Sequence, residues 1–137
     1  MEWLFWFTFS FLHILELGVY SNIKMYQVDF YTTLSGKSPP WEFIQKSEAR
    51  VSRKILRHIQ HIKTSGLTLE NRYLRKLSGS NLWESRILGK DNVRIICATL
   101  SERRVVILNI FSKKSNKTPI KEIDVSKQRF RELTNIS

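Results

Sequence analysis

The sequence predicts an α+β domain in which helices pack against one antiparallel sheet. Three observations support this class: a helical apolar period early in the chain, three closely spaced apolar strands after residue 81, and a second helical pattern near the C-terminal end. The expected order of elements is β-α-α-β-β-β-α. A chain of 137 residues is long enough for one domain with its own core.

The N-terminal half supplies the first strand and two helices. A short alternating strand is expected over residues 25–31, and a short helix after Pro40. The clearest helix is predicted for residues 48–64. Its apolar stripe recurs every three or four positions, at Val51, Ile55, Ile59 and Ile62, and its other face is basic, with Arg50, Arg53, Lys54, Arg57 and Lys63. His58 and His61 also lie on this helix, but the nearby sequence offers no third ligand, so no metal site is expected.

The C-terminal half supplies the sheet and a closing helix. Apolar strands are expected over residues 82–88, 93–100 and 104–111, and their short connections predict an antiparallel meander. Thr118 is the expected N-cap of the closing helix, with Pro119 at its first position. The apolar face of this helix is predicted to comprise Ile120, Ile123, Phe130 and Leu133.

The chain is strongly basic, with a formal net charge of +11. The first 24 residues contain one basic and two acidic residues, so the whole excess lies in residues 25–137. Such a surplus favours a polyanionic partner: nucleic acid, an anionic membrane or an acidic protein. Composition alone does not choose among these three.

Residues 1–24 form an apolar extension before the predicted domain of residues 25–137. The apolar stretch 3–20 follows a negative leader and has no obvious cleavage site, which argues against a secretory signal. Two interpretations are open: an anchor helix, or upstream sequence translated in frame before a start at Met25. The single cysteine, Cys97, excludes a disulfide within one chain and is typical of a buried thiol in a reducing compartment, so a cytoplasmic location is expected.

Cationic side chains are expected to converge on the meander. Arg86 and Arg94 lie in successive strands, and Lys113 and Lys114 follow the third strand. Arg75 and Lys76 would border this surface, while Trp83 and Phe111 could stack on unpaired bases. Guanidinium and ammonium groups suit a phosphodiester and the charge of its transition state. The simpler alternatives are arginines paired with Glu84 or Glu102, aromatic rings in the core, and solvated lysines.

Three stretches resemble a known family. They are KSPPWEF (37–43), RYLRKLSGSNLWESRI (72–87) and RVVILNIFSKKSNKTPIKEI (104–123). They are similar to the GKSPVWEF, YxKKLKGSxLWELR and LLHGFxKKTQKTPxxEI patterns of the phage-derived HigB-like branch of the RelE/ParE toxin superfamily. The similarity runs in order from residue 25 to about residue 133.

The resemblance implies the toxin of a type II toxin–antitoxin system with a RelE-like fold. Such a toxin is a ribosome-dependent mRNA endonuclease that needs neither metal nor cofactor. The RNA's own 2′-hydroxyl attacks the adjacent phosphorus and leaves a 2′,3′-cyclic phosphate. The implied partners are a HigA-like helix-turn-helix antitoxin, the ribosome and mRNA, with operator DNA bound only through the antitoxin complex.

The resemblance also implies roles for single residues. Arg86 and Arg94 would hold the phosphate, and Lys114 with Lys113 would stabilise charge on the phosphorane or leaving oxygen. Glu84 would be either a base or a structural partner of the arginines. The implied RNA contacts are Arg75, Lys76, Trp83, Phe111 and Lys117.

Two departures from the family pattern weaken the expected acid–base chemistry. The family's frequent His is Asn109 here, and its frequent Tyr is Val93. An inactive module that binds antitoxin or operator DNA is therefore one alternative. A ParE-like gyrase inhibitor is another, although the tail similar to KKTQKTP favours the nuclease branch.

Overall fold

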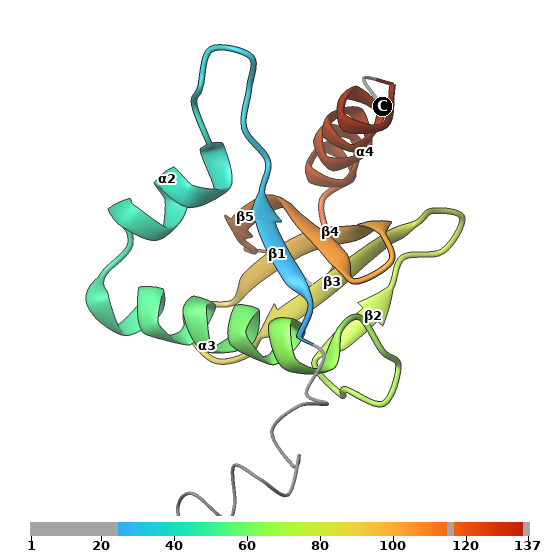
Figure 1. The fold of residues 1–137 in the computed structure, drawn as a ribbon. Helices are drawn as coiled ribbons and strands as arrows, with labels where there is room; N and C mark the ends of the chain where they lie inside the picture. Colours follow the sequence, from blue (N-terminus) through green and yellow to red (C-terminus); the bar gives the residue numbers. More distant parts are fainter. Residues whose placement is uncertain (1–24, 115–116, 136–137) are drawn as a thin grey trace, which may run out of the picture.

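The computed structural model describes residues 25–114 and 117–135 (Figure 1). The elements are β1 (Gln27–Phe30), α2 (Pro39–Lys46), α3 (Ala49–Ser65), β2 (Leu74–Lys76), β3 (Leu82–Ile87), β4 (Val93–Ser101), β5 (Arg104–Ser112) and α4 (Ile120–Thr134). The predicted α+β class is confirmed, with one strand more than expected: the three-residue β2. No helix in the described part of the chain is long and apolar enough to cross a membrane, and the expectations for residues 1–24 lie outside that part.

The five strands form one sheet in the order β1-β5-β4-β3-β2. Strands β2 to β5 are antiparallel, as the predicted meander requires, and β1 joins β5 in parallel. An ion pair joins these two parallel strands, with Arg104 Nε on β5 and Asp29 Oδ2 on β1 lying 2.7 Å apart. The meander therefore lies between two short edge strands.

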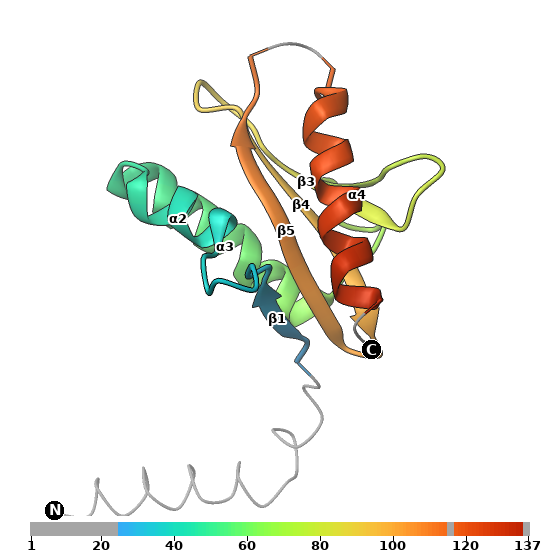
Figure 2. The ribbon, with the colours of Figure 1, turned by 90° about the horizontal axis from the view of Figure 1, so that it is seen from above.

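Helices cover both faces of the sheet, with α2 and α3 on one face and α4 on the other (Figure 2). Side chains of α3 and β4 fill the core on the first face, among them Ile55, Ile62 and Ile95. The second core lies under α4, where Ile123, Phe130 and Leu133 pack as predicted. The prediction for Ile120 was wrong, because this side chain is 76% exposed at the first position of α4.

Helix α3 ends at Gly66, which has a φ of +72°. A Cβ atom at this position would lie 2.4 Å from the ring of Tyr26, so glycine is required both for the backbone and for the close approach. The backbone N–H of Tyr26 donates to the carbonyl of Lys63 at 2.8 Å. The end of α3 thereby fixes the residue that leads into β1.

The start of α4 differs from the predicted cap. The helix begins at Ile120, Pro119 occupies the N-cap position, and no side chain caps the helix. The hydroxyl of Thr118 instead donates to the carboxylate of Glu84 on β3. Threonine often caps a helix, but Thr118 makes a tertiary contact here, because the chain crosses back over the sheet at this point to begin α4.

Candidate functional site

Arg86 and Arg94 lie directly opposite each other on β3 and β4. The next strand along this row contributes Phe111, the partner of Arg94 on β5. Residues paired across a sheet share a face, and Phe111 belongs to the core under α4. Both arginines therefore lie on the α4 face of the sheet.

Glu84 forms the buried centre of this cluster and is fully inaccessible to solvent. Its Oε2 accepts from Arg75 Nη2 at 2.7 Å, and its Oε1 accepts from Thr118 Oγ1 at 2.5 Å. Arg94 Nε lies 3.4 Å from Oε1. Both carboxylate oxygens are thus occupied, and the arrangement makes Glu84 a structural anchor for two arginines.

The cluster contains polar groups that the protein itself does not satisfy. Within the described residues, the Nε atoms of Arg86 and Arg94 are buried and have no hydrogen-bond partner; the 3.4 Å approach of Arg94 to Glu84 lacks hydrogen-bond geometry. Buried donors without partners are uncommon in native proteins. Burial lowers the pKa of Arg94, opposed by Glu84 and assisted by Arg86 and Arg75. The cluster is therefore short of negative charge.

Lys113 belongs to the same charged environment. It is half-buried directly after β5 and shares two hydrogen bonds with Asn92. The backbone N–H of Lys113 donates to Asn92 O at 2.9 Å, and the side-chain Nδ2 of Asn92 donates to Lys113 O at 2.8 Å. Burial is the main cause that lowers the pKa of Lys113, followed by repulsion from Arg94. Lys114 and Lys117 are both exposed. Lys113 therefore lies within electrostatic range of the arginine cluster.

The structure does not bring every predicted RNA contact to this surface. Trp83 packs against the core on the α2 and α3 face, opposite Arg86. Lys76 pairs with Trp83 across β2 and β3, so it also faces that side, whereas Arg75 pairs with Glu84. Phe111 lies on the correct face but is only 8% exposed and packs under α4.

The two positions that depart from the family pattern have different surroundings. Val93 is buried in the core on the α2 and α3 face, so a side chain at this position does not reach the arginine cluster. Asn109 is buried on the α4 face, and its Nδ2 donates to Glu122 Oε2 at 2.6 Å. Its Oδ1 accepts from Arg129 Nη1 at 3.3 Å. Of the two positions, only 109 therefore lies on the face of the arginine cluster, and the expected effect on acid–base chemistry stays a prediction.

The histidines of α3 form no metal site. No three of the His, Cys, Asp and Glu side chains in the described ranges lie close enough to share a metal ion. Instead, Nδ1 of His58 lies 3.0 Å from Oγ of Ser85, and its ring meets that of Tyr73 edge-on at 5.2 Å. His58 thus fastens α3 to the far side of the strand that carries Glu84 and Arg86.

Sequence reasoning missed two residues that shape the site. Thr118 holds Glu84, and Asn92 holds the start of the lysine-bearing connection; Asn92 adopts a φ of +44°. A non-glycine residue with positive φ is most often Asn, so the sequence Gly-Lys-Asp-Asn after β3 carried a signal for this turn.

Comparisons with known proteins bear on the family and the fold. The family model described as "Phage derived protein Gp49-like (DUF891)" matches residues 42–131, which is more than half of the chain. Among solved structures, a double-arginine mutant of the E. coli toxin RelE in the free state is similar, with a TM-score of 0.55 and 14% identity. That match covers 77% of this chain and 97% of the RelE chain, and it shows a common fold. No curated protein matches the chain.

Proposed function

The chain belongs to the phage-derived Gp49-like family, a family of RelE-like toxins, and from this premise we propose that it is an RNA-cleaving toxin. The resemblance of the sequence to the RelE superfamily is confirmed by the family match and the fold. The proposal takes the toxin to be a ribosome-dependent mRNA endonuclease in the cytoplasm, formed by residues 25–137. The observation that carries it is the cluster around Glu84, in which four cationic side chains face one carboxylate. The four are Arg75, Arg86, Arg94 and Lys113.

A phosphodiester is the ligand that this cluster fits best. It supplies the negative charge that the cluster lacks, and its oxygens can accept hydrogen bonds from the guanidinium groups of Arg86 and Arg94. When the 2′-hydroxyl attacks, the phosphorane gains negative charge in front of donors that are already in place. Stabilisation of this kind usually contributes the largest single share of catalysis.

Lys113 is the best candidate for proton transfer. A lysine with a lowered pKa is partly neutral at a lower pH than usual and can then accept the proton of the 2′-hydroxyl. Glu84 is unsuited to this role because it is buried and both of its oxygens are engaged. We therefore assign Glu84 to the positioning of Arg75 and Arg94, and Lys114 and Lys117 to contacts with the RNA backbone.

The proposed partners follow from this activity. A toxin of this kind requires an antitoxin, for which we propose a HigA-like helix-turn-helix protein that also carries the contact with operator DNA. The exposed basic residues of α3 would assist electrostatic association with the ribosome. Neither a cofactor nor a metal is part of the proposal.

One alternative has an observation in its favour. Asn109 cannot transfer a proton at neutral pH, and its amide is tied to Glu122 and Arg129. A chain that binds RNA or antitoxin without cleaving would be consistent with this residue. The two hypotheses, an RNA-cleaving toxin and a binding module that does not cleave, differ in whether Lys113 supports catalysis.

Expression in a bacterial host tests the proposal. Induction of the chain should arrest growth, and co-expression of the proposed helix-turn-helix antitoxin should relieve the arrest. Primer extension on total mRNA should reveal new 5′ ends that require the induced chain. Normal growth with folded protein present, or arrest without new RNA ends, would contradict the nuclease.

A further inference from the structure

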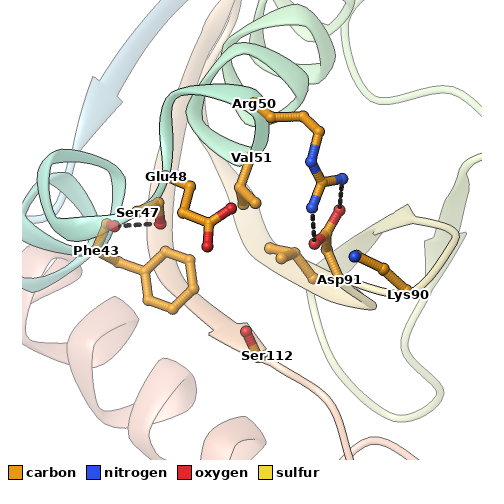
Figure 3. A pocket seen from close by; sticks show the side chains of 9 residues that line it. Phe43, Ser47, Glu48, Arg50, Val51, Lys90, Asp91 and Ser112 are labelled. Carbon is orange, nitrogen blue, oxygen red and sulfur yellow. Dashed lines mark hydrogen bonds and ion pairs between the residues drawn. The ribbon is translucent and has the colours of Figure 1, made fainter.

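A pocket of about 280 Å³ lies on the α2 and α3 face of the sheet (Figure 3). It is at the same end of the sheet as the arginine cluster, which lies on the opposite face. Val93 and Ser112 line it and pair with each other across β4 and β5. The adjacent pair on this ladder is Arg94 with Phe111. The pocket and the cluster are thus separated by one step along the strands and by the thickness of the sheet.

The pocket combines an apolar floor with one available carboxylate. Phe43, Val51 and Val93 supply the apolar surface. The carboxylate of Glu48 points between the Phe43 ring and the Asp91 side chain (Figure 3). The ring face and the carboxylate together suit a flat ligand that carries hydrogen-bond donors.

One wall of the pocket is fixed by an ion pair. Arg50 donates two hydrogen bonds to Asp91, at 2.6 and 2.8 Å, and Lys54 Nζ lies 3.3 Å from the same carboxylate. The hydrogen bond from Arg50 is the main cause that lowers the pKa of Asp91, so this carboxylate stays ionised. Its oxygens are already engaged, which leaves Glu48 as the acceptor for a ligand.

The charges that line the pocket indicate a neutral ligand. Arg50 and Lys90 in the lining are balanced by Glu48 and Asp91, and Lys54 beside Asp91 adds one cation, a smaller excess than that of the arginine cluster. A phosphate or an acidic peptide would gain little net attraction here and would be repelled by Glu48. A nucleobase is neutral and flat, and it can stack on an aromatic ring.

We propose that this pocket binds one nucleobase of the RNA strand held by the arginine cluster, and that Glu48 selects bases with an exocyclic amino group. Adenine N6, cytosine N4 and guanine N2 are amino donors that a carboxylate accepts. Uracil presents carbonyl oxygens at the corresponding positions, which the carboxylate repels. The inference rests on the proposed function, because the strand must first be held at Arg86 and Arg94.

Binding of short oligonucleotides to the full chain tests this assignment. The probes are fluorescein-labelled hexamers of adenine, cytosine or uracil with 2′-O-methyl groups, which block cleavage, and the readout is fluorescence anisotropy. The adenine and cytosine hexamers should bind about tenfold more tightly than the uracil hexamer, as expected for one hydrogen bond to a charged group. Equal affinities for the three hexamers would overturn the assignment of the pocket to a nucleobase while leaving the proposed function intact. Absence of binding by every hexamer would also overturn the pocket assignment, whereas the proposed function is judged separately by growth arrest and primer extension on ribosome-bound mRNA.

Variants locate the preference. Glu48→Ala should reduce the affinity ratio between the adenine or cytosine hexamer and the uracil hexamer to about one. The control Glu102→Ala removes an equal charge at the far turn between β4 and β5 and should leave this ratio unchanged. Phe43→Leu keeps the floor apolar and should weaken all three hexamers about fivefold or more. An unchanged ratio in Glu48→Ala would overturn the inference. Loss of antitoxin affinity in Phe43→Leu, with RNA affinity unchanged, would assign the pocket to the protein partner instead.

Discussion

The hydroxyl of Thr118 donates a 2.5 Å hydrogen bond to Oε1 of Glu84, joining the start of α4 to the buried centre of the arginine cluster. Asn92 holds the other end of the same connection, at Lys113. The segment that carries the lysines is therefore fastened to the sheet at both ends. Thr118 is a positioning residue in this arrangement, because it acts on the reaction through Glu84.

Thr118→Val removes the donor and keeps the shape of the side chain. A buried carboxylate oxygen then loses its strongest neutral partner, which should cost about 1–3 kcal/mol of stability in urea unfolding. Cleavage of ribosome-bound mRNA should fall about tenfold or more because Arg75 and Arg94 are less well held. Thr118→Ser keeps the hydroxyl and should restore both values, whereas a defect in Thr118→Ser as large as that in Thr118→Val would show that the methyl group contributes as much as the hydroxyl.

The arginine pair should be required for cleavage. Arg86→Ala removes a donor to the developing charge and should lower the cleavage rate about 10²–10³-fold with little change in thermal stability. Arg94→Ala should lower the rate to a similar extent, and it should also reduce the melting temperature because Arg94 is buried beside Glu84. Single-turnover cleavage and thermal unfolding measure the two effects separately.

Arg57→Ala is the control for bulk positive charge. Arg57 is exposed on α3, on the other face of the sheet, so its loss should change the cleavage rate much less. A defect in Arg57→Ala as large as that in Arg86→Ala would mean that RNA responds to overall charge and not to the cluster.

The strand pattern explains how much of this site the sequence could predict. Alternation places Glu84 and Arg86 on one face, and the short turn after β3 brings Arg94 opposite Arg86. The same alternation puts Trp83 on the other face, a signal that composition-based reasoning overlooked. The role of Thr118 could not be predicted, because it depends on the path of α4 across the sheet. Strand β2 escaped detection because three residues give no periodicity.

Lys113 should give the cleavage reaction its pH dependence. Its pKa is lowered by burial first and then by Arg94, with Arg75 and Arg86 adding to this effect and Glu84 opposing it. The neutral amine is the active form, so the rate should rise with pH and level off below about 10.4, the ordinary value for lysine. The measurement is the cleavage rate between pH 6 and 9, after subtraction of uncatalysed hydrolysis.

Lys113→Arg keeps the charge but does not titrate in this range. It should lower the rate and abolish the rise with pH, while the matched change Lys114→Arg should preserve the profile of the unmodified chain. If both variants keep the rise with pH, another group transfers the proton.

His58 should make the stability of the domain depend on pH in mildly acidic solution. Its pKa is lowered, first by burial and then by His61 and Arg57. The unfolded chain therefore binds a proton near pH 6.5 that the folded protein does not, so protonation favours unfolding. Stability is fully present above about pH 6.5 and should fall as the pH drops towards the lower pKa of the folded state. Urea unfolding between pH 7.5 and 5.5 measures this window, in which carboxylates contribute little.

The slope of stability against pH, and not its absolute value, identifies the residue. His58→Gln lowers the stability at pH 7.5, because the contacts with Ser85 and Tyr73 change, but it should flatten the slope. His61→Gln should keep most of the slope because His61 is exposed. A slope that survives in His58→Gln would assign the titration to another group and would leave His58 as a packing residue between α3 and β3.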